Sequence, residues 1–169
     1  MEMMVRIGAA CVMTASGAWG GKMLAGAQER RARALHEAGE AVRRLKVEML
    51  ERNMPLKEAL AVCGGLFTAA AEEMKDGSGP GCAYEQAMDR LSARGGSLDC
   101  LTEADRTALR RLFFGLGEGG AQAQRLLLED AQEELERLEK QAVRKREEQG
   151  KLYGSLGALS GIALALIML

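Results

Sequence analysis

The sequence has few of the residues that build metal sites and catalytic centres. His36 is its only histidine, so paired signatures such as H-E-x-x-H are impossible. No C-x-x-C pair occurs, and we interpret the widely spaced cysteines as reduced, mostly buried thiols of a cytosol-facing protein. These cysteines are Cys11, Cys63, Cys82 and Cys100. We therefore expect no catalytic residue, no metal and no cofactor.

The sequence also lacks an excess of charge of either sign. Lys and Arg number 23 and Asp and Glu number 24, so no global basic field could hold a nucleic acid. The glycine-rich stretch 115–120 has neither a preceding strand nor the Lys-Ser/Thr ending of a nucleotide loop, and we interpret it as a helix terminator. We expect a non-enzymatic protein without a small-molecule substrate.

Proline is scarce, with only two in the chain, and so are β-branched residues, while Ala, Leu, Glu and Arg recur throughout. This composition favours an all-α fold. Pro55 suits the first turn of a helix over about 55–75, and Thr102 followed by Asp105 resembles a capping box. We predict a loop over 76–81, helices over about 83–94 and 102–116, and a long helix from about 121.

Uncharged sequence ends the chain, and at 1.5 Å per residue the segment 152–169 reaches about 27 Å, close to the thickness of a bilayer core. We predict a transmembrane helix there. We predict a second over 1–27, in which Lys22 can extend its ammonium to the headgroups. A cleaved signal peptide ending near Ala27 is the alternative, but the arginines that follow at once would oppose export.

Basic residues beside the two spans orient them. Arg30, Arg31 and Arg33 follow the first, and the cluster 144–146 precedes the second, so the domain 28–151 should face the cytosol with both termini external. Each span also has small residues four apart, which permit close helix packing in lipid. These residues are Gly17 and Gly21 in the first span and Gly157 and Gly161 in the second.

Two apolar stripes of equal length flank the middle of the chain. Each has apolar residues at alternating steps of three and four, and the opposite faces are charged. We expect the stripes to pair as an antiparallel coiled-coil-like stalk capped by a helical bundle, with Leu35 near Ala142 and Met49 near Leu128. The stripes are Leu35, Ala38, Val42, Leu45 and Met49, and Leu128, Ala131, Leu135, Leu138 and Ala142.

Several short segments carry a family resemblance. These are L-K-V-E-M-L at 45–50 followed by P-L-K-E-A-L at 55–60, Gly117 with the downstream Gln124, and the apolar tail 151–169. Together they resemble the stage III sporulation protein AB family over nearly the whole chain. Gly120 departs from the family pattern, which usually has an Asp there, so the following helix lacks a side-chain N-cap.

The resemblance implies a structural and assembly subunit of the sporulation channel complex between mother cell and forespore. It implies a location in the mother-cell membrane around the forespore, other channel subunits as partners, and a cytosolic domain similar to the type II secretion F-protein domain. That domain would dock the cytosolic ATPase of the complex through Glu48, Pro55, Leu56 and Glu58. The alternative is a regulatory membrane coiled-coil adaptor with no channel role, in which Pro55 and Leu56 simply begin a helix.

Overall fold

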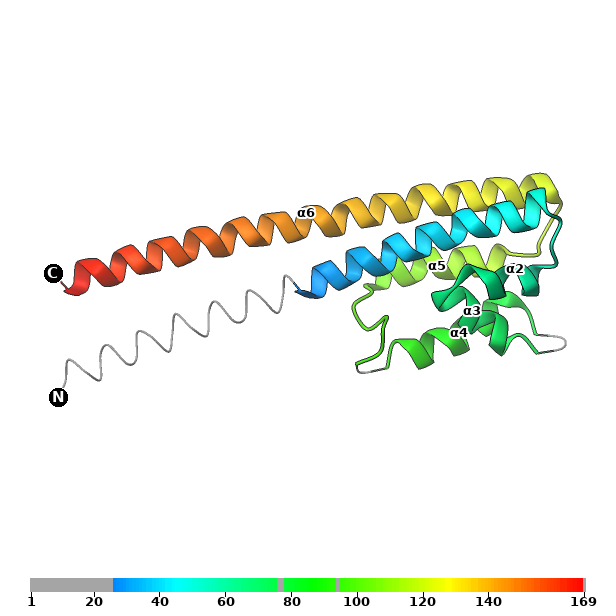
Figure 1. The fold of residues 1–169 in the computed structure, drawn as a ribbon, viewed down its shortest axis with the longest axis horizontal. Coiled ribbons are helices and arrows are strands. Elements are labelled where there is room, and N and C mark those ends of the chain that lie inside the picture. Colours follow the sequence, from blue (N-terminus) through cyan, green and yellow to red (C-terminus); the bar gives the residue numbers. More distant parts are fainter. Residues whose placement is uncertain (1–25, 76–77, 94, 169) are drawn as a thin grey trace. The chain divides into compact units, whose positions relative to one another are not determined.

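The computed structural model describes residues 26–75, 78–93 and 95–168, and Figure 1 shows their course. The chain divides into two units, Arg30–Gln141 and the remainder. All regular structure in the described ranges is helical, with no strand. The predicted all-α fold is therefore confirmed.

The helices follow in simple order. A helix over residues 26–46 runs directly into the π-helical turn η1, Val47–Glu51, and a short non-helical link leads to the bundle. The bundle helices are α2 (Leu56–Cys63), α3 (Gly65–Glu73), α4 (Pro80–Leu91) and α5 (Glu103–Gly115). The long α6 (Ala121–Met168) begins where the sequence predicted.

Two of the predicted boundaries are wrong. The single helix expected over 55–75 is broken between α2 and α3, because Gly64 and Gly65 adopt positive φ angles of 87° and 54° that other residues avoid. The loop predicted to extend to residue 81 ends earlier, since Pro80 occupies the first turn of α4, where a proline costs no hydrogen bond.

The helix 26–46 and α6 pair in the expected antiparallel sense (Figure 1). Lys46 Nζ lies 2.7 Å from a carboxylate oxygen of Glu129, and His36 Nδ1 lies 3.2 Å from that of Glu139. The two contacts lie ten residues apart on each helix and run in opposite directions along the chain, so they define the register of the antiparallel pair. Most residues of the apolar stripes are buried, with exposures of 0–2%, whereas Ala38, Met49 and Ala131 are half-buried. The buried stripe residues of this unit are Leu35, Val42, Leu45, Leu128, Leu135 and Leu138.

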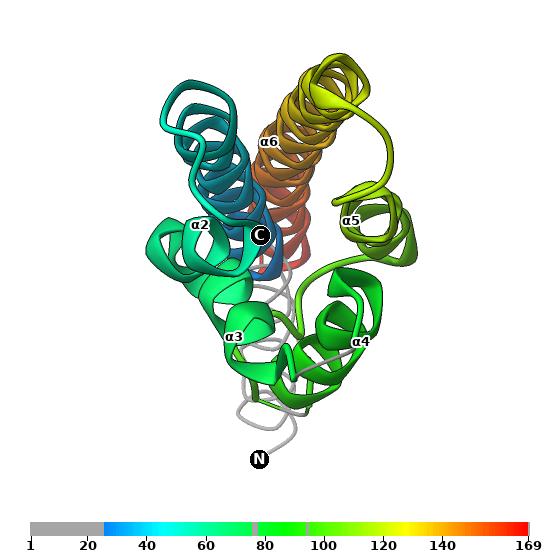
Figure 2. The same ribbon diagram turned by 90° about the vertical axis from the view of Figure 1, so that its right-hand side faces the viewer.

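The bundle helices close around aromatic side chains. Viewed end-on in Figure 2, the helix 26–46, α2, α3, α4, α5 and α6 follow one another around the unit. At its centre, the Phe113 ring of α5 lies 5.0 Å from Phe67 and 4.9 Å from Tyr84. The Tyr84 hydroxyl donates to the Arg106 carbonyl at 3.0 Å, and burial raises the pKa of Tyr84 to about 12. These contacts unite α3, α4 and α5 in one core.

The second unit contains both ends of the chain. Arg146 Nη2 lies 3.4 Å from a carboxylate oxygen of Glu29. Residues 1–25 of the predicted first span, with Gly17 and Gly21, lie outside the described residues. Gly157 and Gly161 lie in the helical backbone of α6. Among the described residues, no helix is sufficiently long and apolar to cross a membrane.

The thiols of the described residues are free, as expected of a reduced protein. Cys63 is buried, Cys100 is partly exposed and Cys82 is exposed, so the expectation of mostly buried thiols is wrong. Cys82 belongs to the solvent-facing side of α4, whereas its neighbours Gly81 and Ala83 are buried. Cys11 lies outside the described residues.

Burial of the stripe predicts a contrast between two valines. Val42 is fully buried, whereas Val62 on α2 is 54% exposed. Val42→Ala should lower the free energy of unfolding by about 2 kcal/mol, because two methyl groups leave the core. Val62→Ala should change it by less than about 0.5 kcal/mol. Urea denaturation of the full chain in detergent, followed by circular dichroism, measures both; equal effects would contradict the assigned core.

Candidate functional site

The residues proposed for partner contact lie where the helix 26–46 ends and α2 begins. Glu48 lies in η1, its side chain is only 15% exposed, and it accepts hydrogen bonds from Arg52 at 2.9 and 3.2 Å. Pro55 and Glu58 are exposed, and Leu56 is half-buried. The structure therefore brings the four residues to one end of the unit and gives Glu48 a structural bond.

The chain reverses direction there through an unusual backbone. The Arg52 N–H donates to the Val47 carbonyl, which widens the last turn into a π-helix, and the Met54 N–H donates to the Glu48 carbonyl at 2.9 Å. Asn53 then adopts a positive φ of 51°, which asparagine tolerates better than most residues. This sequence of turns ends the arm abruptly and leaves Pro55 at the start of α2.

A second loop lies against this turn. The Cδ2 atom of Leu56 lies 3.6 Å from the position that a Cβ atom would take at Gly117, in the loop between α5 and α6. We call residues 47–58 together with the loop 116–120 the tip. Both segments lie at the same end of the unit in Figure 1.

Gln124 holds the second loop of the tip in shape. Its side chain is 94% buried, and its amide nitrogen donates to the Gly115 carbonyl at 3.0 Å and the Glu118 carbonyl at 2.5 Å. Its amide oxygen accepts from the Gly117 N–H at 3.3 Å. Gln124 thus satisfies polar backbone groups of a loop that has no side-chain N-cap at Gly120. The sequence identified this residue only through the family resemblance.

A buried ion pair fixes the opposite end of α5. The guanidinium of Arg31 meets the carboxylate of Asp105 through two hydrogen bonds of 2.7 Å, and the two residues are 4% and 0% exposed. Asp105 also accepts the Thr102 backbone N–H at 2.8 Å, which confirms the predicted capping box. Arg31, interpreted from the sequence as a cation flanking a membrane span, instead points into the protein.

The surroundings of this pair keep both groups charged. Burial alone would raise the pKa of the Asp105 carboxyl, but the hydrogen bonds from Arg31 and Thr102 outweigh burial and hold that pKa below its usual value. The hydrogen bond to Asp105 raises the pKa of Arg31 in turn, against the effect of burial. The pair is therefore a fixed structural contact at neutral pH.

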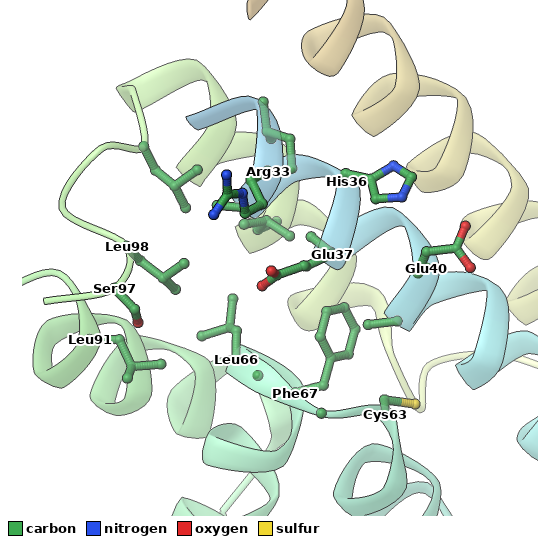
Figure 3. A pocket seen from close by; sticks show the side chains of 18 of the residues that line it. Arg33, His36, Glu37, Glu40, Cys63, Leu66, Phe67, Leu91, Ser97 and Leu98 are labelled. Atoms are coloured by element: carbon green, nitrogen blue, oxygen red, sulfur yellow. The ribbon is translucent and has the colours of Figure 1, made fainter. Parts of the chain in front are cut away.

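A groove of about 560 Å³ lies between the helix 26–46 and the turn that joins α2 to α3 (Figure 3). Glu37 points into it, over the side chain of Leu66. Cys63 also lines it, but its thiol donates to the Ala59 carbonyl at 3.0 Å, and burial raises its pKa to about 11. This thiol is protonated at neutral pH and is a poor nucleophile.

Within the described ranges, no group of histidine, cysteine or carboxylate side chains is placed to hold a metal ion. The tip has an exposed carboxylate at Glu58, an exposed proline, and loops whose backbone is held by internal hydrogen bonds.

Comparisons with known proteins give a family match and a structural match. The family described as stage III sporulation protein AB matches residues 6–169. A solved structure of a stage III sporulation protein AB matches with a TM-score of 0.60 and 20% identity, covering 70% of this chain and 98% of that chain. At this identity the structural likeness establishes a shared fold. No curated protein matches the sequence.

The buried pair predicts a pH-dependent stability. Because the folded-state pKa of Asp105 is lowered, its contribution is complete above the unfolded-state pKa of about 3.9 and is lost as pH falls through the folded-state pKa. Asp105→Asn should cost about 3 kcal/mol at pH 7, since it leaves the Arg31 charge buried without a counter-charge. Below about pH 4 the difference from wild type should shrink.

Chemical denaturation across this pH range measures the effect. Asp89→Asn, on the exposed face of α4, is the matched control and should change the stability by less than about 0.5 kcal/mol. A penalty for Asp105→Asn that stays constant down to pH 3 would contradict the assigned charge state.

Proposed function

We propose that this chain, which belongs to the stage III sporulation protein AB family, is a membrane-anchored structural subunit of the channel complex between mother cell and forespore. Family membership gives the chain a role in sporulation. Our proposal adds that its helical unit Arg30–Gln141 faces the cytosol and docks the cytosolic ATPase of the complex through the tip. Other channel subunits would be its further partners.

The construction of the tip carries this proposal. Both of its loops are held by internal bonds: Glu48 to Arg52 in the first, and Gln124 to three backbone groups in the second. A surface that is ordered before binding loses little conformational entropy when a partner docks. Glu58 makes no ion pair among the described residues and stands exposed in the first turn of α2, free to meet a cation of the partner.

The paired helices 26–46 and α6 connect the tip to the segment proposed as a membrane anchor. Lys46, one residue before the tip, forms an ion pair with Glu129. The Arg43 guanidinium nitrogens lie 3.1 Å from a carboxylate oxygen of Glu40 and 4.0 Å from one of Glu136. The α6 helix is continuous from Ala121 to Met168, so one helix joins the base of the tip to the segment 152–169. We propose that this segment and residues 1–27 anchor the protein in the mother-cell membrane, with packing at Gly17, Gly21, Gly157 and Gly161. A likeness to the type II secretion F-protein domain belongs to the same proposal.

Charge reversal at the tip tests the docking. Glu58→Lys should weaken binding of the purified ATPase about tenfold or more, because it places like charges opposite each other at the interface. Glu103→Lys is the matched control, since Glu103 is an exposed carboxylate in the first turn of α5 and lies outside the tip. Unchanged affinity for both variants would reject the tip as the docking surface and favour the adaptor alternative. Titration of the full-length chain in detergent measures the affinity.

The membrane topology is tested separately. A cysteine introduced at position 2, in a chain lacking Cys11, should react with an impermeant thiol reagent in intact vegetative cells that express the protein. The exposed Cys82 should stay unlabelled until the cells are permeabilised, and so provides an internal control. Labelling of Cys82 in intact cells, or protection of position 2, would contradict the proposed orientation.

A further inference from the structure

A groove separates α5 from α6 on one side of the helical unit. The two helices meet closely at their joined ends, where a Cβ atom at Gly115 would lie 2.9 Å from Leu127. Beyond this contact the helices leave a groove of about 340 Å³ whose half-buried floor includes Ala108, Leu127 and Ala131. Because alanine side chains are short, they do not fill the space between the backbones. Figure 2 shows α5 and α6 as neighbours on this side.

The two edges of the groove have opposite charges. Arg111 lines the α5 edge, and Asp130 and Glu134 line the α6 edge. Glu134 is bonded to Arg137 on its own helix at 2.8 Å. Arg111 and Asp130 are exposed and make no direct ion pair in the part of the chain that the structure describes. The pKa of Glu134 is lowered by its bond to Arg137 and also by the charge of Arg111 across the groove. The groove therefore has an exposed cation on one edge and an exposed anion, Asp130, on the other.

This arrangement is complementary to itself. We propose that two copies of this chain associate groove to groove, with Arg111 of each copy facing Asp130 of the other. Rotation by half a turn about an axis that runs along the groove exchanges the two edges, so that α5 of one copy meets α6 of its partner. The same contact then occurs twice, as an isologous dimer requires, and each contact joins opposite charges.

Apolar surface accompanies these charges. Leu126 lies one turn before Asp130 on α6 and is 53% exposed, a large apolar side chain facing solvent at this edge. The groove floor itself is mainly apolar, and pairing two such floors would remove both from water. Charge thus specifies the partner and its register, while the apolar groups favour association.

The direction of the axis fits two copies that share one membrane. An axis along the groove keeps both α6 helices running in the same direction, as copies related by rotation about the membrane normal must run. An axis across the groove would oppose the two α6 helices and would face Arg111 with Arg111. This choice of axis direction rests on the proposed membrane anchoring. The pairing of Arg111 with Asp130 depends neither on that anchoring nor on ATPase docking.

Charge exchange between two copies tests the dimer. In full-length chain purified in detergent, Arg111→Glu alone and Asp130→Lys alone should each weaken self-association about tenfold or more, because like charges then face each other at both contacts. A mixture of the two variants should form a heterodimer, since each altered edge meets an opposite charge. The chain carrying both substitutions should dimerise again. Sedimentation equilibrium measures self-association, and differently tagged copies report the heterodimer.

Cross-linking locates the interface. A copy with Arg111→Cys and a copy with Asp130→Cys, in chains whose native cysteines are replaced by serine, should form a disulfide-linked heterodimer. Replacing Asp130→Cys by Val62→Cys, on the exposed face of α2, provides the control that should not link. Val62, Arg111 and Asp130 are all exposed, so circular dichroism should show the same helix content for each of these variants as for the serine-substituted parent chain.

Three results would overturn the proposal. They are a wild-type chain that stays monomeric throughout the micromolar range, a dimer that neither charge reversal weakens, and a dimer weakened by both reversals that the mixture does not restore. The first would leave the groove to another polypeptide, and the second would place the dimer contact elsewhere. Loss of ATPase binding by Glu58→Lys in a chain that still dimerises would show that the two surfaces act separately.

Discussion

The buried pair of Arg31 and Asp105 constrains the rest of the helical unit. Removing two charges from water costs several kcal/mol for each ion, and this cost is offset only when geometry and hydrogen bonding are good. Here two bonds of 2.7 Å join the charged groups, and Thr102 donates to the carboxylate as well. Sliding α5 along the helix 26–46 by one turn would leave both charges buried without partners. A single register is therefore strongly favoured.

Fixing α5 has consequences at both of its ends. Its first turn is held by Arg31 and by the capping box, and its last residue, Gly115, offers its carbonyl to Gln124. The tip and the α5–α6 groove are therefore built on a helix that is held at each end. The two surfaces proposed for ATPase docking and for self-association therefore both rest on the register that this ion pair sets.

Local signals allowed much of the fold to be predicted from the sequence. Thr102 and Asp105 marked the start of α5, and the glycines after residue 115 marked its end and the start of α6 near Ala121. The break at Gly64 was missed because the apolar pattern continues across it. The start of α4 was also missed, although Pro80 carries the same first-turn signal that was recognised at Pro55.

The ion pair shows what a single sequence conceals. Arg31 lies four residues before Leu35 and so continues the apolar stripe by one turn, a signal that it faces inward. Its position beside an apolar segment instead suggested a membrane-flanking role. Its partner lies 74 residues away, and no local pattern joins the two. The α5–α6 groove was equally hidden, because it depends on how far two helices separate and not on either sequence pattern.

A double-mutant cycle on Arg31 and Asp105 tests the central claim most directly. The free energy of unfolding of wild type, Arg31→Met, Asp105→Leu and the double variant would be measured by chemical denaturation at pH 7. The account predicts that each single substitution costs about 3 kcal/mol or more, and that the double variant loses at least about 2 kcal/mol less than their sum. Additive losses would contradict it, because they would mean that the two side chains stabilise the fold independently.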